Sequence, residues 1–143
     1  MNKPLTLKEL KECAQKRAAQ VEVSKPFVLG LTGNLGAGKT TFAQAFIRYF
    51  DPEAVVVSPT FSIVQYYAQG KIAHYDLYRI KHPDEFYDLD IFEDMQNKIC
   101  LIEWPEILDI KIPTLEINIV NEALRRIHLI DPIQDRDKGK DKA

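Results

Sequence analysis

The stretch Gly33-Asn34-Leu35-Gly36-Ala37-Gly38-Lys39-Thr40 decides the fold of this 143-residue chain. It matches G-x-x-x-x-G-K-[ST], the pattern of a loop whose backbone N–H groups surround phosphate oxygens. The loop follows an apolar run at 27–32 and precedes a helical pattern, which is the context that this motif requires. Average residue frequencies produce the pattern by chance in about one of a few hundred chains of this length. The sequence therefore predicts a phosphate-binding loop.

Each residue type in this loop has its own chemical reason. Glycines allow left-handed backbone, so that several N–H groups turn toward phosphate at a helix N-terminus. Lys39 is predicted to place a positive charge on the β- and γ-phosphates, and the Thr40 hydroxyl to coordinate Mg²⁺. Thr41 is predicted to bond the α-phosphate. The predicted nucleotide-binding residues of the loop are Gly33, Leu35, Gly36, Ala37, Gly38, Lys39, Thr40 and Thr41.

The segments beside the loop predict an α/β fold. Residues 27–32 are apolar without alternation, as expected for a strand that is covered on both faces. Apolar residues then recur at helical spacing from Phe42 to Phe50. A second fully apolar strand is predicted at 99–102. Both strands are expected in a mostly parallel central sheet.

The rest of the chain predicts shorter elements. Thr6 and Glu9 have the spacing of a capping box, and Leu5 and Leu10 that of a hydrophobic staple, so a helix is predicted over 6–18. The other predicted elements are a short strand at 55–57, a hairpin of 61–67 and 72–78 around a turn at 68–71, a short acidic helix at 83–89, and a second hairpin of 115–120 and 126–130 around a turn at 121–124.

These elements predict a P-loop NTPase-like fold of three layers, in which antiparallel hairpin strands extend a mostly parallel sheet. The sequence shows no internal repeat and no domain boundary, so residues 1–133 are predicted to form a single nucleotide-binding domain. Residues 134–143 alternate Asp, Arg and Lys and are predicted to be a disordered charged tail.

Composition predicts a cytoplasmic protein without membrane contact. Hydrophobic residues make up 45% of the chain and charged residues 28%, and no apolar run approaches the roughly 18 residues that span a bilayer. The N-terminus lacks the apolar core of a secretion signal. Cys13 and Cys100 lie in no C-x-x-C or Cys/His cluster, so both are interpreted as reduced thiols. A net charge of −2 argues against direct binding of a polyanion.

Two classes of P-loop protein do not fit the chain. A GTPase needs an N-K-x-D motif to bind guanine, whereas Asn97-Lys98-Ile99-Cys100 lacks the aspartate, and no D-x-x-G occurs. Transport ATPases carry an S-G-G-Q type signature that is also missing.

Three further motifs accompany the loop: Ser58-Pro59-Thr60-Phe61, His74-Tyr75-Asp76-Leu77-Tyr78-Arg79 and Ile102-Glu103-Trp104-Pro105. In order and spacing, the four motifs resemble those of the TsaE family, the bacterial ATPases of tRNA threonylcarbamoyladenosine biosynthesis. The resemblance runs from about Phe27 to Pro105. One departure is Asn34, where family members usually have aspartate.

The two acids of these motifs have separate expected roles. Glu103 ends an apolar strand, where P-loop proteins place the acid that helps hold Mg²⁺ opposite Thr40. The family motif makes Asp76 the residue that orients or deprotonates the attacking water. A purely structural carboxylate, bonded to Tyr78 or Arg79, is the alternative for Asp76.

Other residues are assigned with their alternatives open. Thr60 is a candidate sensor of the γ-phosphate or of a metal-bound water, or else caps a local turn. Arg79 is a candidate to stabilise charge on the transferred phosphoryl group, or else pairs with a carboxylate. Trp104 is a candidate for nucleotide binding or for contact with a partner, or else belongs to the core, as an indole beside a buried strand more often does. A structural role is favoured for His74. The resemblance leaves open whether Arg125 and Arg126 lie near the base.

The resemblance implies ATP and Mg²⁺ as cofactors and ATP hydrolysis as the activity. It implies a partner complex with TsaD and TsaB type subunits, which transfers a threonylcarbamoyl group to the adenosine beside the anticodon. We expect tRNA to reach the protein through that complex only, and ATP turnover to be weak without it. A small metabolite kinase and a nucleotide-sensing interaction protein are the alternatives. The acidic segment after Arg79 disfavours a second phosphate-bearing substrate.

Overall fold

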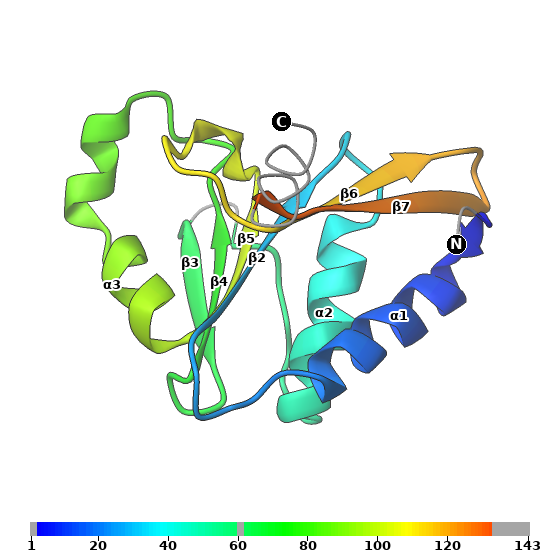
Figure 1. Cartoon of the computed structure of the whole chain (residues 1–143), viewed down its shortest axis with the longest axis horizontal. Coiled ribbons are helices and arrows are strands. Elements are labelled where there is room, and N and C mark those ends of the chain that lie inside the picture. Colours follow the sequence, from blue (N-terminus) through cyan, green and yellow to red (C-terminus); the bar gives the residue numbers. More distant parts are fainter. Residues whose placement is uncertain (1–2, 60–61, 133–143) are drawn as a thin grey trace, which may run out of the picture.

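The computed structural model describes residues 3–59 and 62–132, which form a seven-stranded sheet with helices on both faces (Figure 1). The strand order is β1-β7-β6-β2-β5-β4-β3. The strands are β1 (Leu5–Thr6), β2 (Phe27–Thr32), β3 (Val64–Tyr67), β4 (Ile72–Asp76), β5 (Ile99–Glu103), β6 (Thr114–Ile119) and β7 (Leu124–Ile130). The helices are α1 (Leu7–Ala19), α2 (Lys39–Phe50) and α3 (Ile91–Asn97), with 3₁₀ turns η1 (Pro83–Asp88) and η2 (Pro105–Ile107).

The centre of the sheet is parallel and its edges are antiparallel. β2 pairs in parallel with β5 and with β6, and β5 pairs in parallel with β4. The hairpins β3–β4 and β6–β7 extend this centre on either side, and β1 adds an antiparallel edge against β7. The predicted fold class is therefore confirmed, and both predicted hairpins are present.

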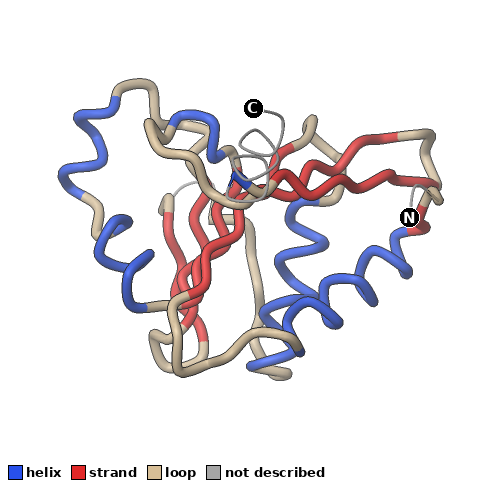
Figure 2. The backbone as a smooth tube through the Cα atoms, viewed as in Figure 1, coloured by secondary structure: helices blue, strands red, loops and turns tan. Residues whose placement is uncertain are grey.

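Two apolar clusters separate the three layers. On one face of the sheet, α1 and α2 lie side by side and bury one cluster with alternate residues of β2, β5 and β6 (Figures 1 and 2). On the other face, η1, α3 and the segment after η2 bury the second cluster. Leu101 belongs to the first cluster, and its neighbour Ile102 to the second. β5 is thus covered on both faces, which explains its unbroken apolar sequence.

The start of α1 is built as its sequence predicts. The Thr6 hydroxyl accepts a hydrogen bond from the Glu9 N–H at 3.1 Å, and the Glu9 carboxylate accepts one from the Thr6 N–H at 3.1 Å. Leu10, in the next turn, is fully buried against α2. The capping box therefore fixes the helix that supports α2.

The structure corrects four local predictions. Residues 55–57 form no strand: Val55 and Val57 are largely exposed, and only Val56 is buried. The helix predicted at 83–89 is the 3₁₀ turn η1, and α3 and β1 are additional elements.

Within 3–59 and 62–132, no helix is long and apolar enough to cross a membrane. The predicted tail 134–143 lies outside the described residues, so its disorder and the domain boundary stay predictions.

Candidate functional site

The glycine-rich loop connects β2 to α2 in left-handed backbone. Gly33, Gly36 and Gly38 have φ of 152°, 82° and 117°. These values are unfavourable for residues with a Cβ atom. Gly38 is also the N-cap of α2, so the loop ends where the helix presents its free N–H groups and the positive end of its dipole. Such an arrangement attracts anions, phosphate in particular.

Glycine is also favoured by close packing toward both ends of the loop. A Cβ atom on Gly38 would lie 2.9 Å from Cδ2 of Leu10 on α1. On Gly33 it would collide with the backbone carbonyl of Ile117 on β6. The loop is therefore held between α1 and β6, elements that are distant from it in the sequence.

Lys39, the first residue of α2, folds back over the loop. Its side chain is 5% exposed, and its Nζ donates to Gly33 O at 2.5 Å and to Asn34 O at 3.2 Å. The same Nζ lies 4.2 Å from the centre of the Trp104 ring. Burial lowers the pKa of Lys39, although nearby carboxylates, Glu103 first among them, oppose the shift. The ammonium group is thus held at the loop without an ion pair to any described carboxylate.

Two acids end neighbouring parallel strands beside the loop. Asp76 is paired in register with Glu103, and both side chains are buried. Glu103 accepts a hydrogen bond from the Thr40 hydroxyl at 3.3 Å and another from His74 Nε2 at 2.6 Å. The bond from His74 holds Oε2 of Glu103, while Oε1 of the same carboxylate faces Thr40 at the start of α2.

Asp76 has a different environment from Glu103. Its Oδ1 accepts a hydrogen bond from the Tyr78 N–H at 3.0 Å. Burial raises the pKa of Asp76, and the Glu103 charge raises it further, while the Tyr78 N–H, His74 and Lys39 oppose the shift. A carboxylate whose pKa is raised by burial is more basic than an exposed one, and such a group is suited to accept a proton.

A pocket of about 300 Å³ lies between the loop and these acids. Its lining contains nine of the predicted site residues: Leu35, Gly36, Gly38, Lys39, Thr40, Thr41, Asp76, Glu103 and Trp104. The other predicted residues lie elsewhere. Gly33 is at the base of the loop, Ala37 is buried in the core with its N–H donating to Asn34 O, and Arg79 is exposed. Thr60 lies outside the described residues.

The arrangement has the donor set of a small hard cation. The Thr40 hydroxyl and the Glu103 carboxylate face each other, and Mg²⁺ is commonly held by one or two protein oxygens together with phosphate and water. No group of three or more His, Cys, Asp or Glu side chains in the described ranges forms a closed metal cage. These two residues therefore fit a metal that arrives with a phosphate ligand.

Comparison with known proteins places the chain in a family. The model of the family described as "Threonylcarbamoyl adenosine biosynthesis protein TsaE" matches residues 5–128. The chain belongs to the TsaE family. The match extends on both sides beyond the four motifs, from β1 to β7.

Individual TsaE relatives agree with this assignment. The tRNA threonylcarbamoyladenosine biosynthesis protein TsaE of Rickettsia conorii is 44% identical over 99 residues, which are 66% of this chain and 55% of that protein. The protein of the same name from Bacillus subtilis is 38% identical over 95 residues, 65% of this chain and 60% of that protein. The match thus spans little more than half of these two relatives.

A solved structure supports the fold over nearly the whole chain. The crystal structure of Bacillus subtilus YdiB superposes with a TM-score of 0.60 at 25% identity, covering 99% of this chain and 95% of that one. The structural similarity is therefore not limited to the loop.

Four residues of the site were not among the predicted site residues. Ser58 and Tyr78 line the pocket, and each stands in a motif of the TsaE resemblance, which is the signal that could have found them. His74, for which the sequence favours a structural role, bonds Glu103 directly. Arg125 donates to two loop carbonyls from β7, and no motif marks it.

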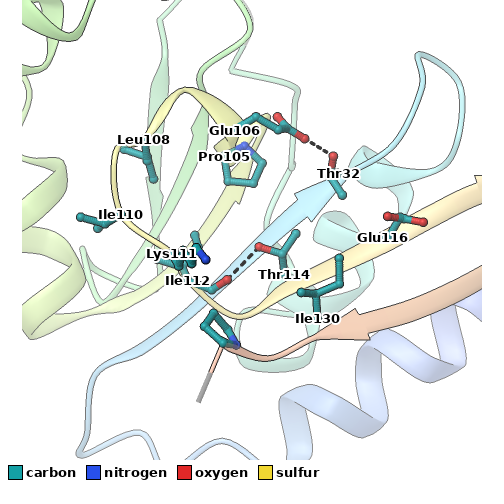
Figure 3. Close-up of a pocket in the computed structure, with 11 residues that line it drawn as sticks. Thr32, Pro105, Glu106, Leu108, Ile110, Lys111, Ile112, Thr114, Glu116 and Ile130 are labelled. Carbon is teal, nitrogen blue, oxygen red and sulfur yellow. Dashed lines mark hydrogen bonds between the residues drawn. The ribbon is translucent and has the colours of Figure 1, made fainter. Parts of the chain in front are cut away.

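A second cavity, of about 780 Å³, opens beside Thr32, directly before the loop (Figure 3). The Thr32 hydroxyl donates to the Glu106 carboxylate at its edge. Its described lining pairs two carboxylates, Glu106 and Glu116, with one cation, Lys111. The smaller pocket has the same balance, Asp76 and Glu103 with Lys39, but it also lies at the glycine loop and the N-terminus of α2, so it is the better phosphate site.

Proposed function

We propose that this chain binds ATP with Mg²⁺ at the glycine-rich loop and hydrolyses it in support of tRNA threonylcarbamoyladenosine biosynthesis. It acts with a threonylcarbamoyl-transferase complex of TsaD and TsaB type subunits. The observation that carries the proposal is the register of β4 against β5, because it brings Asp76 and Glu103 to the pocket that Lys39 and Thr40 line. Membership of the TsaE family supports the biosynthetic role.

The chain's own groups divide the work of phosphoryl transfer. Lys39 and the N-terminus of α2 neutralise charge on the β- and γ-phosphates. Thr40 and Glu103 would hold the metal, which when bound would supply further neutralisation of the phosphate oxygens. Asp76 orients a water for attack and accepts its proton, in keeping with its raised pKa. Water becomes bonded to the γ-phosphorus as the bond to the β–γ bridging oxygen breaks, giving ADP and inorganic phosphate.

The test combines turnover by the purified chain with tRNA modification in cells. Phosphate release is measured with ATP and Mg²⁺ for the wild type and for Asp76→Ala. Each variant is also expressed in a bacterium that lacks its own TsaE protein, and threonylcarbamoyladenosine in bulk tRNA is measured by mass spectrometry. We expect the wild type to restore the nucleoside and Asp76→Ala to fail.

Lys25→Ala serves as a surface control, because Lys25 is exposed and its ion pair is with the exposed Glu22, three residues before it. It should behave as the wild type in both assays. Restoration of the nucleoside by Asp76→Ala at wild-type level would show that hydrolysis is not the contribution of this chain. Transfer of labelled phosphate to a metabolite instead of to water would favour the kinase alternative.

A further inference from the structure

We propose that Arg125 is a positioning residue for the phosphate loop, an inference that rests on the proposed function and extends it. Arg125 lies on β7 and is 7% exposed. Its Nε donates to Ala37 O at 2.7 Å, and its Nη2 donates to Gly36 O at 3.1 Å. One guanidinium thus holds two successive carbonyls of the loop, from a position outside the described lining of the pocket.

The remaining donor of the guanidinium faces backbone as well. Nη1 donates to Asn121 O at 2.8 Å and to Leu124 O at 3.1 Å. Within residues 3–59 and 62–132, no carboxylate forms an ion pair with Arg125. A buried charge without a counterion is costly, and hydrogen bonds to carbonyls offset only part of that cost. Negative charge bound on the other side of the loop offsets it further.

The hydrogen bond from Arg125 to Ala37 O also fixes the direction of the Gly38 N–H group. The Ala37 carbonyl and the Gly38 N–H belong to one planar trans peptide, so they point in opposite directions. Because Arg125 holds the carbonyl on its own side, the Gly38 N–H is turned away from Arg125, and Gly38 lines the pocket. Glycine allows this peptide to rotate more freely than other residues do. The arginine removes that freedom before phosphate arrives.

The support of Arg125 comes from elements outside the loop. Leu5 of β1 pairs with Arg125 across the sheet edge, and Ile119 of β6 pairs with it on the other side. In the turn between β6 and β7, the Asn121 side chain accepts hydrogen bonds from the N–H groups of Ala123 and Leu124 at 2.9 and 3.0 Å. The turn is therefore shaped independently of the arginine that it receives.

The position of the guanidinium separates this role from reading of the base. A residue that selects adenine over guanine presents a donor or acceptor to the base edge, whereas the hydrogen-bond partners of Arg125 within the described residues are loop and turn carbonyls. Loss of Arg125 is therefore expected to weaken the binding of every nucleotide that carries a β-phosphate by a similar factor. The ratio of affinities for ATP and GTP is expected to stay unchanged.

The experiment compares Arg125→Met, which removes the charge and the donors, with Arg125→Lys, which keeps the charge but not the fork. Arg126→Met is the matched control, because Arg126 is the next residue of β7 and is exposed. Affinities for ATP, ADP and GTP are measured by calorimetry with Mg²⁺. Thermal unfolding without nucleotide is measured for each variant, and hydrogen exchange of the Gly38 and Ala14 amides is followed by NMR for Arg125→Lys.

We expect Arg125→Met to weaken ATP and ADP roughly 10- to 100-fold, the range for one or two lost charge-assisted hydrogen bonds. The affinities of Arg125→Lys for ATP and ADP should be intermediate. Its Gly38 amide should exchange hydrogen faster than in the wild type, whereas the amide of Ala14, a buried residue of α1, should not. Arg126→Met should bind as the wild type does.

Two results would overturn the inference. One is an affinity of folded Arg125→Met for ATP and ADP that lies within twofold of the wild-type value. If Arg125→Met does not fold, the same criterion applies to Arg125→Lys. The other is a selective change in the ATP to GTP ratio, which would assign Arg125 to the base. Failure of the wild type itself to bind ATP and ADP would instead overturn the proposed function.

Discussion

At the scale of single residues, Lys39 carries the first prediction. Lys39→Ala should abolish measurable ATP binding, because the N–H groups of the loop then face the β- and γ-phosphates without the cation. Its Nζ already lies against Gly33 O and Asn34 O, so little reorganisation is needed to meet phosphate. Calorimetry with ATP and Mg²⁺ measures the effect. Binding within about threefold of the wild type, less than roughly 1 kcal/mol, would contradict the placement of the phosphates.

The two acids should differ in the kind of defect that they cause. Glu103→Ala should weaken Mg²⁺-dependent ATP binding and also turnover, because Glu103 faces the Thr40 hydroxyl. Asp76→Ala should spare binding and lower kcat, the pattern of a group engaged mainly in the transition state. ATP titrations with and without Mg²⁺, together with single-turnover rates, separate the two. Equal loss of binding in both variants would rule out separate roles.

What could be predicted about the site depends on how far apart its residues lie in the sequence. The loop is a contiguous motif, so its type, its flanking strand and its helix were predicted from local pattern alone. Asp76 and Glu103 were found through strand ends and the family resemblance, and the register of β4 on β5 brings them together. Arg125 lies 88 residues from Ala37, and no spacing in the sequence signals a side chain that bonds only backbone carbonyls.

At the scale of elements, the capping box of α1 supports a stability prediction. Thr6→Ala should lower the free energy of unfolding by about 1 kcal/mol, the usual cost of losing such a cap. Hydrogen bonds from Thr6 N–H and hydroxyl lower the pKa of Glu9 from its ordinary value of 4.5. The pKa of Glu9 is thus lower in the folded protein than in the unfolded chain. The Glu9 carboxylate therefore stabilises the fold above about pH 4.5, and this stabilisation is lost as the pH falls through the pKa of Glu9 in the folded protein.

Thermal unfolding across pH tests the capping box. Glu9→Ala should have a lower Tm than the wild type at neutral pH, and the difference should shrink in strongly acidic buffer. Glu12→Ala is the control, since Glu12 is an exposed residue of the same helix outside the cap. A difference between Glu9→Ala and the wild type that is constant across pH would show that the carboxylate's charge does not act in the cap.

Elements that are buried on both faces were predicted most directly from the sequence. The apolar strands β2 and β5 lie in the middle of the sheet, where both faces are covered. Residues 55–57 have the same β-branched composition, but the edge of the sheet beyond β4 is taken by β3, and the segment has no ladder partner among the described strands. β propensity without a neighbouring strand does not make a strand. The two-residue β1 is too short to give a periodic signal.

At the scale of the whole molecule, charge and size bear on the expected partners. The chain has 143 residues and a net charge of −2, a balance that argues against direct electrostatic capture of tRNA. The pocket at the loop is bordered by the exposed Leu35 and Tyr78, whose side chains are 69% and 53% exposed. Efficient phosphoryl transfer needs a closed site and positive charge on the γ-phosphoryl oxygens.

The last prediction follows from these needs: the isolated chain should hydrolyse ATP slowly, and the threonylcarbamoyl-transferase complex should accelerate it, with or without tRNA. In related P-loop proteins an arginine supplied by a partner changes the rate by factors on the order of 10³ to 10⁵. Arg79 is exposed and is not part of the described lining of the pocket, so a partner that covers this face is needed either to bring Arg79 to the phosphates or to supply its own cation.

Steady-state phosphate release is measured for the chain alone, with the complex, and with complex and tRNA, at fixed ionic strength. An Arg79→Ala variant in the same three mixtures distinguishes the two sources of charge, because only a cation from the partner leaves the acceleration intact. Turnover by the chain alone at the rate of the full mixture would mean that the site is already complete, and activation by a partner would then be wrong.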